Sequence, residues 1–331
     1  MRPQGFHPRI AQGKITAMNS LNVPTIDISQ LANDPEVISR VGTACADWGF
    51  FQVINHGIDP NLRARFLHAC QAFFHAPDEL KRGVLRSADN PMGFFDEELT
   101  KNQRDWKQIF DYGADWRDPT ADYHSRWPAT MPDFEDILLA WFEACEDLSL
   151  RLLAAMATSL NVDPEILLTS FRPSHTSFAR LNYYPLCDDP MRDDPQTGSN
   201  AGHLGIHPHT DSGALTVLLQ DDVAALQVCR EGQWHTIEPA VDGLIINIGD
   251  MLQVWSNDQF TAPEHRVLAS SKRERFSAPF FFNPANNTDC VPLTGTTPLY
   301  QPVNWGQFRQ ARAAGDYANV GEEIQISQFK R

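Results

Sequence analysis

A five-residue segment of the chain, His207-Pro208-His209-Thr210-Asp211, contains two imidazoles and one carboxylate, all of which can bind a metal ion. In an extended segment every second side chain points to the same side, so His209 and Asp211 would face one point in space. His207 would face the same way. The spacing therefore indicates a metal site without choosing between the two histidines, and a further ligand must come from elsewhere in the chain.

His265 is the candidate for that ligand, because it lies late in the β-rich part of the chain on an expected inward-facing strand. Two histidines and one carboxylate on one side of an iron ion form the facial triad, which leaves the opposite coordination positions open. A structural zinc site would need four ligands, usually including cysteine, and no cysteine lies close to residues 207–211. A His-x-Asp pair alone is more often polar surface, so the prediction needs support from other residues.

Support comes from the segment Arg275-Phe276-Ser277, in which Arg275 and Ser277 alternate onto one face of an expected strand. An inward guanidinium needs a partner, and a carboxylate that accepts two of its hydrogen bonds is the best one. The alternative is that residues 272–275 form a solvated basic turn. Lys272 and Arg273 fit that alternative, whereas Arg275 begins the strand.

Residues 178–184 give a second polar face. One face of this expected strand has Leu181 at its centre, with Ala179 and Tyr183 beside it. Buried polar groups need partners, so an inward face rich in polar side chains is unusual for a pure core. The pattern is equally compatible with a solvated polar face and a core on the Leu181 side. The polar face consists of Phe178, Arg180, Asn182 and Tyr184.

The first half of the chain is expected to combine helices with two short strands. Residues 23–29 and 50–58 predict the strands, and the apolar spacing of residues 35–50 predicts a helix between them. A second helix is expected to begin near Pro60, because proline suits the first helical turn. Residues 91–118 show no clear period and are expected to form a long loop with some strand. A long helix is expected over residues 134–160, and another near Pro164.

After Phe171 the chain changes to short apolar segments separated by turn residues. This pattern predicts a barrel or double-sheet jelly roll rather than parallel βαβ units. Residues 230–232 are expected to form a hairpin turn, and residues 305–315 a last helix. Eight segments are expected to contain strands: SFARLNYY, LGIHPHTD, LTVLLQ, LQVCREGQWHTI, GLIINIG, MLQVWS, EHRVLAS and RFSAPFFF.

Composition argues against two classes of partner. The 331 residues carry a formal net charge of −15, whereas nucleic acids and anionic membranes select clustered Lys and Arg. The N-terminus lacks the apolar region of a signal peptide, and no run reaches the 18 apolar residues typical of a membrane span. None of the six cysteines forms a CxxC pair. We therefore expect a cytoplasmic protein with reduced cysteines and no nucleic-acid or membrane partner.

Several segments together resemble the non-haem Fe(II)/2-oxoglutarate dioxygenases of the isopenicillin N synthase-like group. The resemblance covers residues 22–310 and implies a mixed α/β (α+β) fold. Its expected core is a double-stranded β-helix, a jelly-roll or cupin-like arrangement, flanked by N-terminal helices and a C-terminal helix. The segments that carry the resemblance are VPTIDIS, WGFFQVINHGI and TKNQRDWKQIFDYG in the first half, and NYYP, HTDSGALTVLLQD, INIGDMLQVWSN, EHRV and RFSAPFFFNP in the second.

Carried over residue by residue, the resemblance assigns the iron triad to His209, Asp211 and His265, which makes His207 a neighbour of the site. The acidic segment 187–202 departs from the family pattern and is expected to be a longer surface loop. The 2-oxoglutarate carboxylate clamp falls on Arg275 and Ser277, with further cosubstrate contacts at Asn182 and Tyr184. Expected walls of the substrate pocket are Phe94, Phe95, Arg180, Phe280 and Phe282.

The implied organisation is one compact unit. It comprises a loose N-terminal arm (residues 1–21), an N-terminal dioxygenase region (22–140), a long helix with the jelly-roll core (141–310) and a C-terminal tail (311–331). The family's usual condition is a monomer.

The implied activity is oxidation of a C–H bond of a small molecule by hydroxylation, demethylation or desaturation, in secondary metabolism. Fe(II), 2-oxoglutarate and O2 are the implied cofactor and cosubstrates, ascorbate is the expected external reductant, and succinate and CO2 are released. Two alternatives stay open. Isopenicillin N synthase-like oxidases keep the Arg-x-Ser pair but use no keto acid, and a non-catalytic protein could retain the fold to bind a small ligand.

Overall fold

Strands that are buried along almost their whole length form the middle of the larger of the two main β-sheets. The computed structural model describes residues 23–113, 123–193, 200–317 and 324–331. Continuous burial is typical of a sheet that is covered on both faces. The strand order of the larger sheet is β1 (Thr25–Asp27), β2 (Phe50–Ile54), β14 (Leu244–Ile248), β11 (Leu215–Gln220), β16 (Arg275–Phe282), β7 (Phe178–Tyr184), β6 (Gln108–Gly113) and β3 (Gly93–Phe95).

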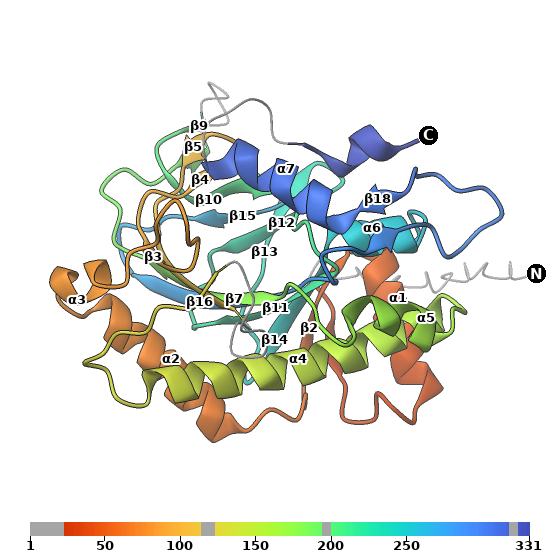
Figure 1. The fold of residues 1–331 in the computed structure, drawn as a ribbon, viewed down its shortest axis with the longest axis horizontal. Coiled ribbons are helices and arrows are strands. Elements are labelled where there is room, and N and C mark those ends of the chain that lie inside the picture. Colours follow the sequence, from red (N-terminus) through yellow and green to blue (C-terminus); the bar gives the residue numbers. More distant parts are fainter. Residues whose placement is uncertain (1–22, 114–122, 194–199, 318–323) are drawn as a thin grey trace, which may run out of the picture.

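A smaller sheet of four strands lies over one face of the larger one (Figure 1). Its order is β10 (Leu204–His209), β15 (His265–Leu268), β12 (Leu226–Arg230) and β13 (Gln233–Thr236). The expected hairpin joins β12 and β13 through Glu231 and Gly232, whose φ values of 52° and 75° fit the two-residue turn that matches strand twist. Two facing sheets with flanking helices confirm the expected jelly-roll class.

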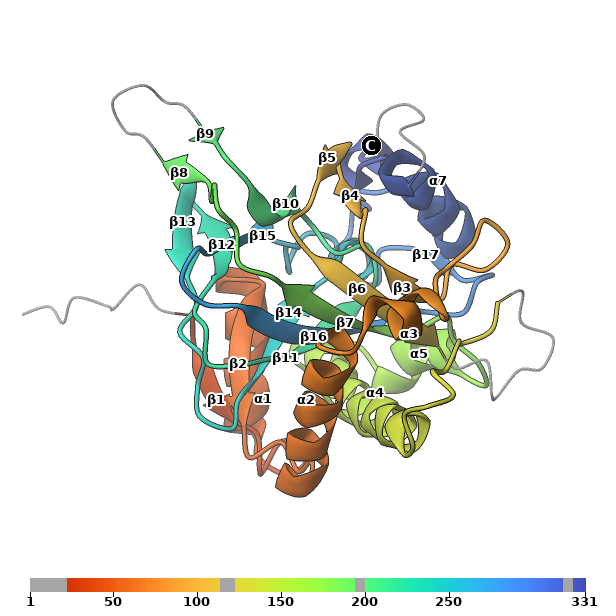
Figure 2. The same cartoon turned by 90° about the vertical axis from the view of Figure 1, so that its left-hand side faces the viewer.

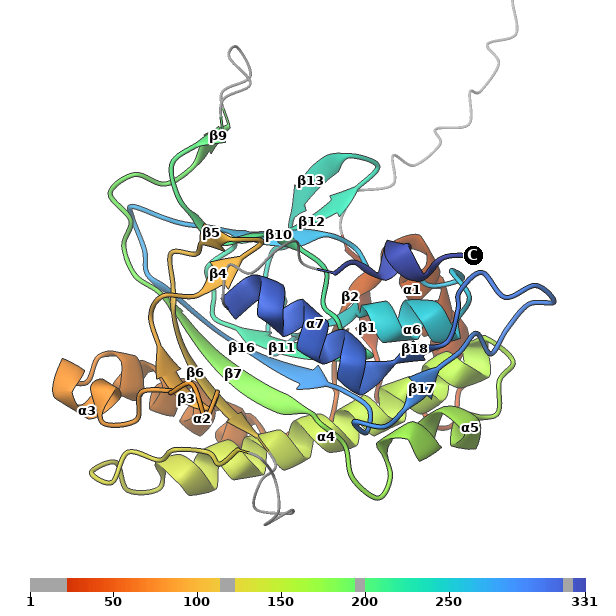
Figure 3. The same cartoon turned by 45° about the horizontal axis from the view of Figure 1, so that its top comes forward.

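Helices cover the other face of the larger sheet. In Figures 2 and 3, α1 (Pro35–Asp47), α2 (Pro60–Phe74) and α4 (Phe134–Ser159) lie on the side of this sheet that faces away from the smaller sheet. The first two begin where expected, because Asp34 and Asp59 accept a backbone hydrogen bond and a proline follows each. The expected C-terminal helix is α7 (Trp305–Tyr317), on the side of the smaller sheet (Figure 1).

Short elements complete the described chain. Within the described residues, no helix is long and apolar enough to cross a membrane.

The expected N-terminal arm, residues 1–21, lies outside the described residues, and the expected boundary at residues 140 and 141 falls within α4. The short elements are α3 (Asp78–Arg82), α5 (Pro164–Leu168), two 3-10 turns (Thr169–Phe171 and Ile326–Phe329), and the pairs β4 (Leu99–Thr100) with β5 (Gln103–Arg104), β8 (Arg192–Asp193) with β9 (Asn200–Ala201), and β17 (Asp289–Cys290) with β18 (Val303–Asn304).

One expectation about secondary structure is wrong, and another gives too little strand. The segment MLQVWS is not a strand but the helix α6 (Asp250–Trp255), in which every residue is buried, so no amphipathic period marks it as helical. Residues 91–113, the described part of the expected loop with some strand, contain more strand than expected, in β3, β4, β5 and β6. β6 pairs with β7 over six residues and extends the larger sheet, and the paired residues lie 65 to 75 positions apart, beyond the reach of a local pattern.

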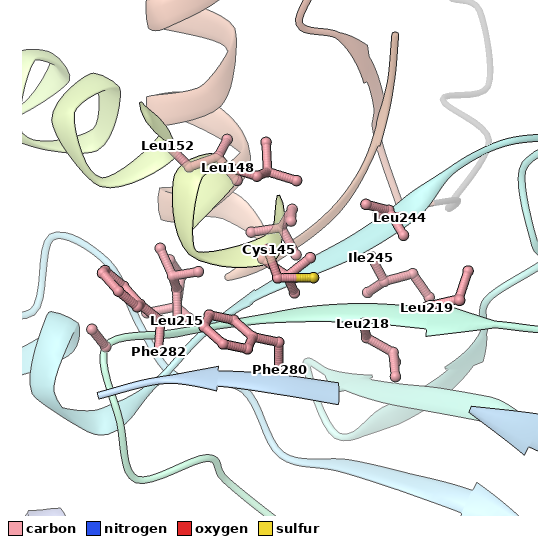
Figure 4. Packing of buried hydrophobic residues seen from close by; sticks show 14 of the residues in the cluster. Cys145, Leu148, Leu152, Leu215, Leu218, Leu219, Leu244, Ile245, Phe280 and Phe282 are labelled. Carbon is pink, nitrogen blue, oxygen red and sulfur yellow. The ribbon is translucent and has the colours of Figure 1, made fainter. Parts of the chain in front are cut away.

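Alternation along β16 separates the core from the space between the sheets. Phe280 and Phe282 point toward α4, where Cys145 and Leu148 lie, and Leu215 of the neighbouring strand β11 points to the same side of the sheet (Figure 4). The ring of Phe280 contacts that of Phe142 at 4.8 Å. The expectation that Phe280 and Phe282 form pocket walls is therefore wrong, because residues at odd positions of this strand face the other way.

Phe280→Ala should lower the free energy of unfolding by about 3–5 kcal/mol, because it empties a fully buried aromatic position in the core. Urea unfolding followed by circular dichroism measures this. The matched control is Phe281→Ala on the opposite face of the same strand, where the half-buried ring stacks on Phe178 at 4.7 Å. It should cost clearly less stability. Equal losses for both variants would contradict the separation of the two faces.

Candidate metal centre

Pairing between β10 and β15 brings the two candidate histidines together. His209 is the last residue of β10 and pairs directly with His265, the first residue of β15. Asp211 follows β10 by two residues. Its Oδ1 lies 3.7 Å from Nε2 of His209 and 3.6 Å from Nε2 of His265, and one ligand atom from each residue lies within 4.8 Å of the others. The three expected ligands thus converge on one point.

Hydrogen bonds to the outer atoms orient each of the three side chains inward. Nδ1 of His209 lies 2.8 Å from the carbonyl oxygen of His207, and Nδ1 of His265 lies 3.3 Å from that of Pro263, which turns both Nε2 atoms toward the centre. Oδ2 of Asp211 accepts hydrogen bonds from Asn247 Nδ2, at 2.8 Å, and from the hydroxyl of Thr216. Its Oδ1 is thereby left facing the imidazoles.

The protonation states suit metal binding. Burial, followed by the nearby His265, lowers the pKa of His209 to about 3. Burial raises the pKa of Asp211, but the two histidines and the hydrogen bonds from Asn247 and Thr216 outweigh it and hold this pKa below its ordinary value. A neutral imidazole and an ionised carboxylate are the forms that bind a divalent cation.

A contact from the C-terminal helix fixes the turn between two of the candidate ligands. Nη2 of Arg312, on α7, donates to the carbonyl oxygen of Thr210 at 2.9 Å and lies 3.1 Å from its hydroxyl. Nη1 donates to Asp250 Oδ2 at 3.0 Å, and the backbone N–H of Asp250 donates to the carbonyl oxygen of Asp211 at 2.8 Å. Sequence reasoning missed Arg312 and Asp250, because their partners are distant in sequence.

His207 makes a different contact. Its Nδ1 lies 2.9 Å from Oδ1 of Asp105, which also accepts from the His207 backbone N–H at 3.0 Å. Asp105 is buried, and Lys107 and His207 lower its pKa to about 2 although burial opposes this. His207 therefore belongs to a neighbouring ion-pair cluster and does not join the three converging side chains.

A cavity adjoins the triad and is lined by both candidate cosubstrate strands. β7 and β16 pair so that Tyr184 lies opposite Arg275, and Asn182 opposite Ser277, with all four side chains lining the cavity. The alternation expected for residues 178–184 is confirmed, and both faces of β7 are buried. Also along the cavity lie Phe178 and Arg180, whereas Phe94, Phe95, Phe280 and Phe282 do not reach it.

The two N-terminal phenylalanines expected in the wall have other contacts. Phe94 packs on Phe73 in the core at 6.2 Å, and the guanidinium of Arg86 lies over the ring of Phe95 at 3.4 Å. The aromatic side chains that line the cavity are instead those of Phe50, Phe178, Tyr184 and Phe281.

The cavity end at Arg275 contains polar atoms without partners. Nη2 of Arg275 donates to Gln220 Oε1 at 2.9 Å, Nη1 lies 3.3 Å from the Ser277 hydroxyl, and the guanidinium lies over the Tyr184 ring at 5.0 Å. Nε of Arg275, Nε2 of Gln220 and Oδ1 of Asn182 are buried without a hydrogen-bond partner. Leaving the N–H donors of Arg275 and Gln220 unpaired is costly, so these two groups fit a small anion with several oxygen atoms, whereas Oδ1 of Asn182 is an acceptor and needs a donor.

Comparison with known proteins matches both halves of the chain. Residues 175–284 match the family model of the 2OG-Fe(II) oxygenase superfamily, and residues 23–133 match the N-terminal model of non-haem dioxygenases in morphine synthesis. The chain is 30% identical to jasmonate-induced oxygenase 2 of Arabidopsis thaliana, over 93% of this chain and 83% of the relative. It is 32% identical to gibberellin 3-beta-dioxygenase 1 of Pisum sativum, over 93% and 81%.

Solved structures agree with these matches. The crystal structure of JOX2 in complex with 2OG, Fe and JA has a TM-score of 0.76 and 31% identity, covering 87% of this chain and 84% of that one. Neurospora crassa T7H in complex with alpha-KG has a TM-score of 0.75, covering 86% and 94%, and at 24% identity it supports the fold alone. The chain therefore belongs to the 2OG-Fe(II) oxygenase superfamily and is an oxidoreductase that uses Fe(II) and 2-oxoglutarate to oxidise a small molecule.

Proposed function

We propose that His209, Asp211 and His265 hold the Fe(II), and that Arg275 and Ser277 bind the distal carboxylate of 2-oxoglutarate with help from Asn182 and Tyr184. The observation that carries this proposal is the cavity itself: three converging ligands and a buried guanidinium with an unpaired Nε line the same space. A facial triad leaves coordination positions open for a bidentate cosubstrate and O2. When bound, the metal and keto acid supply the oxidising chemistry, with succinate and CO2 as by-products.

The chain's own residues bind and orient. Arg275 is held by Gln220, Ser277 and the ring of Tyr184, so its guanidinium is positioned before any ligand arrives. The histidines are oriented by backbone carbonyl oxygens, and Asp211 is oriented by the larger sheet. Such preorganisation lets the site bind its ligands without first rearranging.

The substrate is a small molecule, and we propose that it enters the end of the cavity opposite Arg275. Names of relatives as different as gibberellin 3-beta-dioxygenase and flavanone 3-dioxygenase occur at 32% identity, so overall similarity does not choose among substrates. The net charge of −15 supports a further proposal that the protein acts without a nucleic-acid or anionic-membrane partner. We also propose that it is a cytoplasmic monomer that uses ascorbate as external reductant.

His209→Ala should abolish tight Fe(II) binding, because it removes one of three ligands, whereas His207→Ala should retain it. Anaerobic Fe(II) titration measures this, followed by the visible charge-transfer absorption that a keto acid gives when it chelates Fe(II). Wild-type protein and His207→Ala should develop the band on addition of 2-oxoglutarate. Fe(II) affinity lost in His207→Ala and kept in His209→Ala would assign the ligands the other way.

Arg275→Gln should weaken 2-oxoglutarate binding by about 2–5 kcal/mol, at least about 30-fold in Kd, because a buried carboxylate would lose its charged partner. Anaerobic titration of the Fe(II) protein with 2-oxoglutarate measures this. The matched control is Arg273→Gln. Arg273 lies two residues before Arg275, is exposed and is paired with Asp222, so this variant should leave the Kd unchanged. An unchanged Kd in Arg275→Gln would mean that the guanidinium serves another carboxylate, as in the keto-acid-independent oxidases.

A further inference from the structure

The paired strands β7 and β16 run along the cavity wall and place different side chains at its two ends. Arg275 lies opposite Tyr184 at one end, and Phe281 lies opposite Phe178 at the other, with the two phenyl rings stacked at 4.7 Å. Arg180 projects between these ends and lines the cavity. With 2-oxoglutarate at Arg275, the aromatic end is the space left for the substrate, so any substrate selectivity of this end rests on the proposed function.

Two cations along the cavity wall, Arg180 between the two ends and Lys107 level with Tyr184, already have internal carboxylate partners. Nε and Nη2 of Arg180 donate to the two carboxylate oxygens of Asp111 at 2.7 and 2.8 Å, and Nη1 donates to Glu98 Oε2 at 2.6 Å. Nζ of Lys107 lies 2.9 Å from Asp105 Oδ2 and 3.6 Å from Glu98 Oε2. Both cations line the cavity, and both are held by carboxylates that belong to the protein.

The cluster that these residues form is balanced in charge and buried. Arg86 adds a third cation, with Nη1 at 3.1 Å from Glu98 Oε1. Three cations thus face three carboxylates, and none of the six side chains is more than 10% exposed. Burial opposes ionisation, but the neighbouring cations hold the pKa of Glu98 below its ordinary value, and the neighbouring carboxylates hold that of Lys107 above its own. In their charged forms the three cations and three carboxylates balance, and His207 is a further hydrogen-bond partner of Asp105.

The remaining cavity cation is neutralised in the same way. Arg312 is paired with Asp250 at 3.0 Å and donates to Thr210. Among the described arginines and lysines that line the cavity, Arg275 alone has only uncharged hydrogen-bond partners, although the charge of Asp221 is near enough to interact with it. A substrate carboxylate that enters the aromatic end would lose its hydration. Every cation that it could reach there is already paired with a carboxylate of the protein, so its binding is unfavourable.

We propose that the carboxylates of Glu98, Asp105 and Asp111 make this site selective for an uncharged substrate with a ring and a hydroxyl or carbonyl group. The ring packs against Phe178 and Phe281. The ammonium group of Lys107 has three N–H donors and two carboxylate partners. Its third donor can therefore bind a neutral oxygen of the substrate. Glu98 is the specificity-determining residue, because it is shared by Arg86, Lys107 and Arg180.

The test compares an acid with its amide, which have nearly the same shape and differ in charge. Indole-3-acetate and indole-3-acetamide, and 3-phenylpropionate and 3-phenylpropionamide, are dialysed at pH 7.5 against the anaerobic Fe(II) protein with saturating 2-oxoglutarate, which keeps Arg275 occupied. In the wild type, each amide should bind at least tenfold more tightly than its acid. Glu98→Gln should strengthen acid binding at least tenfold, because Arg180 and Lys107 lose a shared anion.

Controls separate charge from misfolding. Glu97→Gln removes an exposed carboxylate next in sequence and should behave as wild type. Asp111→Asn also unbalances Arg180 and serves as a second variant if Glu98→Gln fails to fold. Acids that bind the wild type as tightly as the amides, or a folded Glu98→Gln or Asp111→Asn protein that gains no acid binding, would overturn the proposal. If the wild type binds neither probe, a gain of acid binding in the variants still supports it.

Binding of 2-oxoglutarate itself distinguishes the proposed function from the proposed selectivity. Wild-type protein that fails to bind 2-oxoglutarate contradicts the proposed function. Protein that binds 2-oxoglutarate normally but shows no preference for amides over acids contradicts only the proposed selectivity.

Discussion

Asp211 is the residue at which the two sheets of the jelly roll meet, and the metal centre depends on that meeting. Its Oδ1 faces His209 and His265, which are paired across the smaller sheet. Its Oδ2 accepts hydrogen bonds from Thr216 and Asn247, which are themselves a cross-strand pair of the larger sheet. A shift of one sheet against the other would therefore separate the three ligand atoms. The distances at the centre are set by the packing of the whole fold, and the short His-x-Asp segment could not maintain them alone.

Buried charge is distributed unevenly around the cavity. The cation at one end has no carboxylate partner in hydrogen-bond contact, whereas the other cations are paired with carboxylates of the protein. Arg180, Lys107 and Arg312 are compensated within the protein, whereas Arg275 has neutral hydrogen-bond partners and an unpaired Nε. An uncompensated buried charge destabilises a folded protein, so this end gains most when an anion binds. An unpaired buried donor such as Nε of Arg275 is expected at a position where a bound ligand supplies the missing hydrogen-bond partner.

Alternation along strands made much of the site predictable from sequence. It placed Arg275 with Ser277, and Asn182 with Tyr184, on shared faces, and the same rule would have excluded Phe280 and Phe282, which have the opposite parity in β16. A lone asparagine in the otherwise apolar strand β14, LIINI, was a usable signal for Asn247. No local signal identified the partners of Glu98 or Arg312. The Arg180–Glu98 and Arg312–Asp250 ion pairs join residues 82 and 62 positions apart, and Lys107, another partner of Glu98, lies in a segment without clear period. The burial of α6 on all sides removed the periodicity that would have identified it as a helix.

The proposed chemistry and the proposed selectivity come from different parts of the chain. The proposed triad and the proposed cosubstrate clamp lie within residues 175–284, whereas Glu98, Asp105, Lys107 and Asp111 lie within residues 23–133, which a separate family model matches. Glu98, Asp105 and Lys107 flank the short strands β4 and β5, and Asp111 lies within β6, outside the smaller sheet that carries the histidines. Substitutions at Glu98 or Asp111 would alter the charge along the cavity without removing a hydrogen-bond partner of the proposed ligands, whereas Asp105 holds His207, whose carbonyl oxygen orients His209. This separation gives a physical reason why relatives about equally similar to this chain can carry names that refer to different small molecules, since the metal centre places few constraints on the opposite end of the cavity.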